Sequence, residues 1–163
     1  MIALYLLLFH PFGTPESVAV QGEELRQIPV HYETDLEQGY CLFGEIEDDT
    51  AVVKEVVHTK YPIPWTNSGS RIDFTCIPEI TGRLPELAAH NYSFIGAVHT
   101  HPSSTSGGTT EMSVADENWF KATSMFQRIH GIATEDRVSF YTVNDTEDSV
   151  TTLKYRYRGK IVG

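Results

Sequence analysis

Short apolar runs bounded by turn residues recur along this chain of 163 residues and constrain its fold more than any other feature. Runs rich in Val, Ile, Tyr, Phe and Thr between turn residues are typical of strands. The strands predicted in this way are Ile2–His10, Tyr40–Glu47, Ala51–His58, Arg71–Ile77, Phe94–His101, Gly131–Glu135, Val138–Val143 and Val150–Tyr157. The acidic turn at 48–50 indicates that the second and third of them form a hairpin. A sheet therefore dominates the expected fold.

Helical signals are fewer. Pro78–His90 opens with a proline, which is favoured in the first turn of a helix. Ser113–Phe126 opens with Ser113 as a predicted N-cap and has apolar residues at helical spacing. Its predicted apolar stripe consists of Ala115, Trp119, Ala122 and Phe126. Together these elements predict an α+β fold over residues 1–163, a single domain with a mainly antiparallel sheet and helices packed against it.

Composition excludes several functions. Twelve Lys and Arg against twenty-two Asp and Glu give a net charge of −10. We therefore expect no basic surface that could bind a phosphate backbone, and no nucleic-acid partner.

The apolar start, Met1–Phe9, is too short to span a bilayer and lacks the features of a signal peptide. We therefore expect no membrane association and a cytoplasmic location. Nothing in the sequence specifies an oligomeric state.

The two cysteines, Cys41 and Cys76, do not form a CxxC motif. Both lie in apolar runs that predict strands. We predict two buried free thiols in preference to a disulfide.

The segment with the clearest chemistry is Gly96–Asp116. His99 and His101 are two apart on a predicted strand, so their imidazoles project from one face and can bind one metal ion. A catalytic zinc ion takes three protein ligands and keeps one position open. Asp116, in the first turn of the predicted helix, can supply the third ligand, and Ser113 shares its face. The other histidines are isolated and are interpreted as ordinary surface or core residues: His10, His31, His58, His90 and His130.

These residues resemble the JAMM (MPN+) metalloproteases, whose pattern is an upstream Glu, then His-x-His-Pro, then Ser-x-x-Asp. The upstream stretch that matches is Glu37-Gln38-Gly39-Tyr40-Cys41-Leu42-Phe43-Gly44. Glu37, Leu42 and Gly44 fall in register with the family, whereas Tyr40 stands where the family usually has Gly. The loop Ser103–Met112 is also longer than is usual in the family. Metallo-β-lactamase, zincin, zinc-deaminase and cupin patterns fit this segment less well.

The resemblance implies an MPN domain, which is a three-layer, cytidine-deaminase-like fold, of the small prokaryotic or archaeal type. It implies one zinc ion per chain, held by His99, His101 and Asp116. It also implies that Glu37 is the general base and acid and that Ser113 stabilises the oxyanion. The implied activity is a zinc-dependent peptidase or isopeptidase, cutting the bond at the C-terminus of a ubiquitin-like or sulfur-carrier protein.

In such an enzyme, the substrate would lie extended beside the histidine strand and pair with a sheet edge. The loops Lys60–Ser70 and Ser103–Met112 are expected to flank it. Two alternatives stay open: a non-catalytic MPN scaffold, and a zinc hydrolase of small peptides or amides.

Overall fold

A computed structural model describes residues 14–20, 28, 37–59, 76–101, 109–134, 137–144, 149–157 and 160–162, with side chains as far as Leu153. The predicted strand Ile2–His10, the loop Lys60–Ser70 and residues 103–108 lie outside this range. Most of the predicted strand Arg71–Ile77 does too, and its last residue begins a helix instead.

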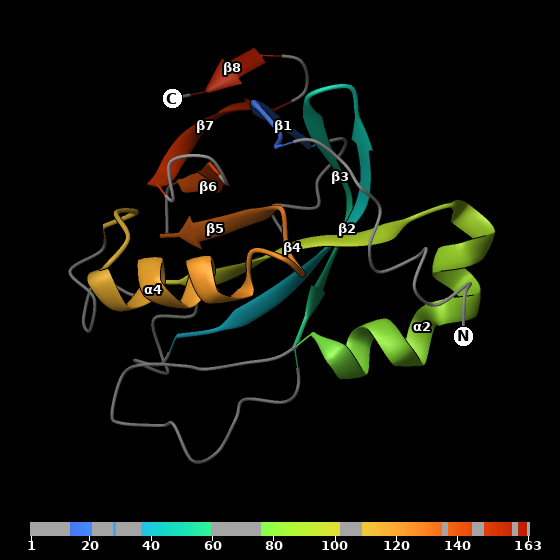
Figure 1. The fold of residues 1–163 in the computed structure, drawn as a ribbon. Coiled ribbons are helices and arrows are strands. Elements are labelled where there is room, and N and C mark those ends of the chain that lie inside the picture. The colour runs from blue at the N-terminus through green and yellow to red at the C-terminus, as the bar shows by residue number, and fades with distance from the viewer. Residues whose placement is uncertain are drawn as a thin grey trace.

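The described residues form one sheet and two helices (Figure 1). The strands are β1 (Ser17–Val20), β2 (Gly39–Glu47), β3 (Thr50–His58), β4 (Ser93–Thr100), β5 (Ile129–Ala133), β6 (Val138–Asn144), β7 (Ser149–Tyr157) and β8 (Lys160–Val162). The helices are α2 (Ile77–His90) and α4 (Val114–Thr123). The predicted hairpin is confirmed, because β2 pairs antiparallel with β3 and Asp48 adopts a left-handed φ of 51° in the turn.

The sheet is mixed and curls until its ends meet. Its order is β1-β3-β2-β4-β5-β6-β7-β8, and β7 also pairs with β1. The pairs β1–β3, β1–β7 and β4–β5 are parallel, and the other neighbours are antiparallel. Because β7 returns to β1, the strands β1 to β7 enclose a common interior.

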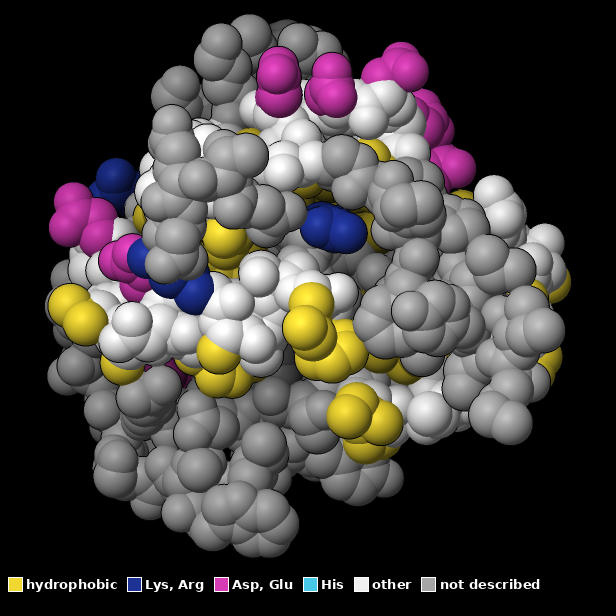
Figure 2. Space-filling model, in the orientation of Figure 1, with side chains coloured by type: hydrophobic (Ala, Val, Ile, Leu, Met, Phe, Trp, Pro, Cys, Tyr) yellow, Lys and Arg dark blue, Asp and Glu magenta, His cyan; other side chains and the backbone are white. Residues whose placement is uncertain are grey.

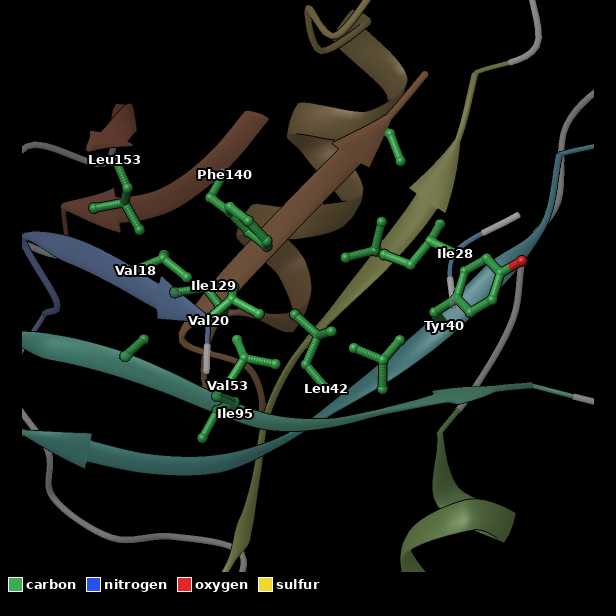
Figure 3. Close-up of a cluster of buried hydrophobic side chains, with 14 of the residues drawn as sticks. Val18, Val20, Ile28, Tyr40, Leu42, Val53, Ile95, Ile129, Phe140 and Leu153 are labelled. Carbon is green, nitrogen blue, oxygen red and sulfur yellow. The ribbon is translucent and has the colours of Figure 1, made fainter. Parts of the chain in front are cut away.

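The main core fills this interior with side chains from every enclosing strand. Figure 3 shows these side chains pointing toward one another from strands far apart in the sequence. The contributors include Val18, Leu42, Val53, Ile95, Ile129, Phe140 and Leu153. Alternation sends these side chains into the interior, and register shifts of β2 against β3 and β4 interrupt it locally. The curled sheet therefore covers its own inner face and needs no helix there.

A second core lies on the outer face, beneath α2. Cys41 and Phe43 alternate with the interior residues of β2 and pack with Ile80 and Leu87 of the helix. The helix ends as predicted, because Asn91 adopts a left-handed φ of 57° and caps it. Strand β2 is thus buried on both faces.

The prediction of two free thiols is wrong, because Cys41 and Cys76 form a disulfide with a Cα–Cα distance of 5.8 Å. Cys76 immediately precedes α2 and is buried in the same outer core. The bridge therefore joins the start of α2 to the first half of β2.

The predicted three-layer MPN domain, with a sheet flanked by helices, is also wrong. Only two helices occur in the described ranges, and both lie against the outer face of a curled mixed sheet. The physical reason is the pairing of β7 with β1. A sheet closed in this way buries one face against itself, so helix layers on two sides cannot form.

Helix α4 also differs in detail from its prediction. It ends at Thr123, and Ala122 and Phe126 of the expected apolar stripe are exposed. Phe120 is the fully buried residue of this helix. The buried face is therefore rotated from the predicted one, toward β5.

Gly44 occupies a site on β2 where no side chain fits. A Cβ there would lie 2.0 Å from the Val52 carbonyl oxygen, beside the irregularity between Phe43 and Gly44. We predict that Gly44→Ala forces β2 and β3 apart and lowers the free energy of unfolding by about 3 kcal/mol, measured by urea denaturation. Gly82→Ala in α2 is the control, because nothing lies within 4 Å, and it should raise stability by about 0.5–1 kcal/mol. Equal effects of the two variants would contradict the close approach.

The disulfide closes a long segment, since its cysteines are 35 residues apart. A crosslink over this separation restricts the unfolded chain by about 3–4 kcal/mol in the chain-entropy model. We predict that dithiothreitol lowers Tm by about 10 °C. The Cys41→Ala/Cys76→Ala variant should melt near the reduced wild type and should not respond to reductant. A wild-type Tm that ignores reductant would count against this contribution.

Candidate metal centre

The two predicted metal-binding histidines lie at the end of β4, which is fixed on both edges. His99 is opposite Gly39 of β2 on one side and Ile132 of β5 on the other. The amide of His101 donates to the carbonyl oxygen of Ala133 at 2.8 Å. Both residues are buried, with 5% of each exposed. The backbone of each histidine is therefore held by neighbouring strands.

Asp116 reaches these histidines from the N-terminus of α4. The Ser113 hydroxyl accepts from the Asp116 amide at 3.2 Å, and Asp116 Oδ2 accepts from the Ser113 amide at 2.9 Å and from its hydroxyl at 2.6 Å. This is a reciprocal capping box. It leaves Oδ1 3.6 Å from His99 Nε2 and Oδ2 3.7 Å from His101 Nε2.

His99, His101 and Asp116 form a group that can hold a metal ion, with one ligand atom from each lying within 4.8 Å of the others. The two Nε2 atoms are 2.9 Å apart. Ligands about 2.0–2.1 Å from a tetrahedral ion are about 3.3 Å apart, so small movements suffice to bind one. Two imidazoles and a carboxylate form a typical donor set for a divalent transition metal.

His101 is already in the tautomer that a metal needs. Its Nδ1 lies 2.9 Å from the carbonyl oxygen of Thr109, which can only accept. A proton is therefore on Nδ1, and in this tautomer the lone pair of Nε2 faces His99 and Asp116. Thr109 is held near β6, because the next residue, Thr110, accepts from the Tyr141 hydroxyl and from the Ser139 hydroxyl.

Glu37 lies beside the group, immediately before β2. It is buried, and its Oε1 is 4.0 Å from His101 Nε2. The adjacent residue fixes its backbone, because Gln38 donates to the Thr100 hydroxyl at 2.8 Å and accepts from the Thr100 amide at 2.9 Å. A carboxylate at this distance can reach a small molecule bound next to His101.

The electrostatics of Asp116 suit a ligand. Burial raises the pKa of Asp116, but charge interactions with His99 and hydrogen bonds from Ser113 lower it by more. The net pKa lies below the ordinary value, so Asp116 is a carboxylate at neutral pH. The Ser113 hydroxyl is exposed and accessible, although its proton is directed at Asp116.

His130 belongs to this cluster, and the sequence interpretation of it as an ordinary isolated histidine missed it. It is fully buried on β5, and its Nε2 lies 2.8 Å from His99 Nδ1. Burial holds the pKa of His130 well below the ordinary value, because desolvation disfavours the charged ring, so this ring is neutral. No spacing in the sequence indicates this contact, because it depends on the register that places His130 opposite Ala97.

Acidic side chains outside the site gather at the other end of β2. Figure 2 shows them along one edge of the molecule, where Figure 1 draws the turn between β2 and β3. Glu47, Asp48 and Asp49 are exposed there, as is usual for charged residues in a turn. In the part of the chain that the structure describes, no helix is long and apolar enough to cross a membrane.

Comparison with known proteins supplies a similar fold and no function. The sequence matches no protein-family model and no curated protein. Among solved structures, it is similar to the solution structure of protein DSY2949 from Desulfitobacterium hafniense, with a TM-score of 0.60 and 14% sequence identity. The match covers 88% of this chain and 94% of that one. At this identity, the likeness shows a shared fold alone.

The ligand group predicts one metal ion per chain. Adding Zn²⁺ to metal-free protein should raise stability by about 4 kcal/mol at a thousandfold excess over Kd, measured as a rise in Tm. His101→Ala should remove both the bound ion and this rise while the chain remains folded by circular dichroism. His90→Ala is the control, because His90 is exposed at the end of α2 and should leave binding intact. Full binding by His101→Ala would place the ion elsewhere.

Proposed function

We propose that the protein is a zinc-dependent peptidase or isopeptidase that cuts the amide bond at the C-terminus of a ubiquitin-like or sulfur-carrier protein. The observation that carries this proposal is the buried Glu37 carboxylate, 4.0 Å from His101 Nε2 and beside a three-ligand group. A metal site with three protein ligands and an adjacent carboxylate is the arrangement used in metal-assisted hydrolysis.

The order of these residues supports the choice of reaction. Glu37, then His99 and His101 before a proline, then Ser113 and Asp116, resembles the motif of the JAMM metalloproteases. The support comes from the site and not from the overall fold. Zinc suits the donor set, because imidazole and carboxylate ligands in tetrahedral geometry are typical of it.

Each side chain has a role in this proposal. A zinc ion in the site would lower the pKa of a coordinated water toward about 7. Glu37 accepts the proton of the attacking water and passes it to the leaving amine. Ser113 turns its hydroxyl from Asp116 to the developing oxyanion, where one such donor contributes about 10²–10³ in kcat. His99, His101 and Asp116 keep their backbone positions throughout, because strands and a helix cap hold them.

The substrate has to reach the site without pairing with an edge of β4. This strand pairs with β2 and β5 along its site end, so a substrate cannot add to its edge. The described segment Thr109–Ser113 begins beside His101 and ends at Ser113, the N-cap of α4. We place the scissile bond next to this segment, with the leaving lysine amine directed at Glu37.

A variant pair tests the chemistry. Glu37→Gln should reduce hydrolysis of Lys-linked ubiquitin-like conjugates by about 10²–10⁴ without changing metal content, because it removes only the proton carrier. Glu47→Gln, at the exposed end of β2, is the matched control and should be unaffected. Ser113→Ala should lower kcat by about 10²–10³ and stability by about 1 kcal/mol, since it also removes the cap.

The outcomes separate the alternatives. Metal-loaded protein that hydrolyses no amide, with Glu37→Gln indistinguishable from wild type, would support a scaffold and overturn the enzyme. Cleavage of short peptides with no cleavage of conjugates would support a hydrolase of small amides. Preference for conjugates, lost in Glu37→Gln, is the result expected.

A further inference from the structure

His130 is placed against the back of His99 by the pairing of β4 with β5. It lies opposite Ala97, and alternation puts its side chain on the same outer face as the metal-binding histidines. The rings of Trp119 and Phe120 lie 5.3 Å from its ring on the other side. The imidazole is therefore enclosed between β4 and α4 and is fully buried.

The two ring nitrogens of His130 differ in whether they have a hydrogen-bond partner. Nε2 lies 2.8 Å from His99 Nδ1, whereas Nδ1 is buried without a hydrogen-bond partner among the described residues. A buried ring nitrogen without a partner is uncommon, because its desolvation is not compensated. The packing thus gives His130 one polar contact, and that contact is with a predicted ligand.

The position of one proton decides whether His99 can bind a metal. If His130 donates from Nε2, His99 Nδ1 accepts, and the proton on His99 Nε2 points at His101 Nε2, 2.9 Å away. That arrangement closes the site. If His99 instead donates from Nδ1 to His130 Nε2, its own Nε2 lone pair faces the ligand position. The two arrangements are tautomers and carry the same number of protons.

We propose that His130 is a positioning residue of the metal centre, which accepts the Nδ1 hydrogen of His99 and so fixes that ring in the metal-binding tautomer and orientation. The proton of His130 then lies on Nδ1. This inference rests on the metal site of the proposed function and does not depend on which bond the protein cuts. Partners of this kind typically change metal affinity about 10–100-fold when removed.

Three variants separate hydrogen bonding from packing. His130→Phe keeps an aromatic ring between β4 and α4 but cannot accept from His99. His130→Gln restores an acceptor close to the position of Nε2. Phe120→Leu is the packing control, because it loosens the same contact with the ring of His130 and leaves His99 its partner.

The main measurement is the Kd for Zn²⁺ by competition with a chelator, with the d–d absorption of bound Co²⁺ as a readout of ligand geometry. We expect His130→Phe to weaken binding about 10–100-fold and to alter the Co²⁺ spectrum, and His130→Gln to recover most of the affinity. Phe120→Leu should lower Tm with Kd within about threefold of wild type. Wild-type affinity and spectrum in His130→Phe would overturn the proposal.

Nitrogen NMR of the wild type tests the tautomer even if the His130 variants do not fold. In the Zn²⁺-bound protein, ¹⁵N shifts should show protons on Nδ1 of both His99 and His130. A proton on His130 Nε2 in that state would overturn the proposal. If zinc binds with this pattern and no amide is cut, the proposed hydrolysis fails while the role of His130 stands. If no zinc binds at all, both fail.

Discussion

The pairing of β4 on both of its edges is the constraint on which the rest of the site depends. On one edge, β2 brings Glu37 alongside, because Gly39 is opposite His99 and Gln38 bonds to Thr100. On the other edge, β5 brings His130 behind His99 and holds the His101 amide. Strands of a sheet hold side chains more rigidly than loops do, which suits groups that must converge on one ion. The parallel and antiparallel partners of β4 thus contribute different parts of one cluster.

The capping box of α4 shows that a structural role and a functional role can reside in the same residues. Ser-x-x-Asp is first a helix cap, and the hydrogen bonds of Ser113 and Asp116 confirm that reading. The cap also fixes the carboxylate, with Oδ2 bonded to Ser113 and Oδ1 directed at His99. A ligand held by a cap needs little reorganisation when an ion arrives. The cap interpretation therefore supports the metal interpretation and does not compete with it.

The sequence predicted local structure well and long-range pairing poorly. Strands β2 to β7 and helix α2 lie close to their predicted positions, because alternation, helical spacing and turn residues act over a few neighbours. The closure of β7 onto β1 and the disulfide join residues far apart in the sequence, and no local pattern encodes such pairings. The burial of Phe120 instead of Phe126 was missed for a related reason, since the face of α4 is set by β5.

The ligands of the candidate site were predictable because each lies in a short motif, whereas His130 was not. Its contact needs the register of β4 against β5 as well as the sequence. The local nature of these motifs explains why the site can resemble a family whose expected helix layers the described residues do not form. His-x-His at a strand end and an acidic helix cap are local geometries, and function depends on such sites more than on the fold that carries them. Three buried imidazoles are costly in a hydrophobic core unless their ring nitrogens are hydrogen-bonded. Here His130, His99 and His101 are hydrogen-bonded in that order. This ordered polar chain ends at the carbonyl of Thr109 and keeps the ligand atoms of the candidate metal group close together.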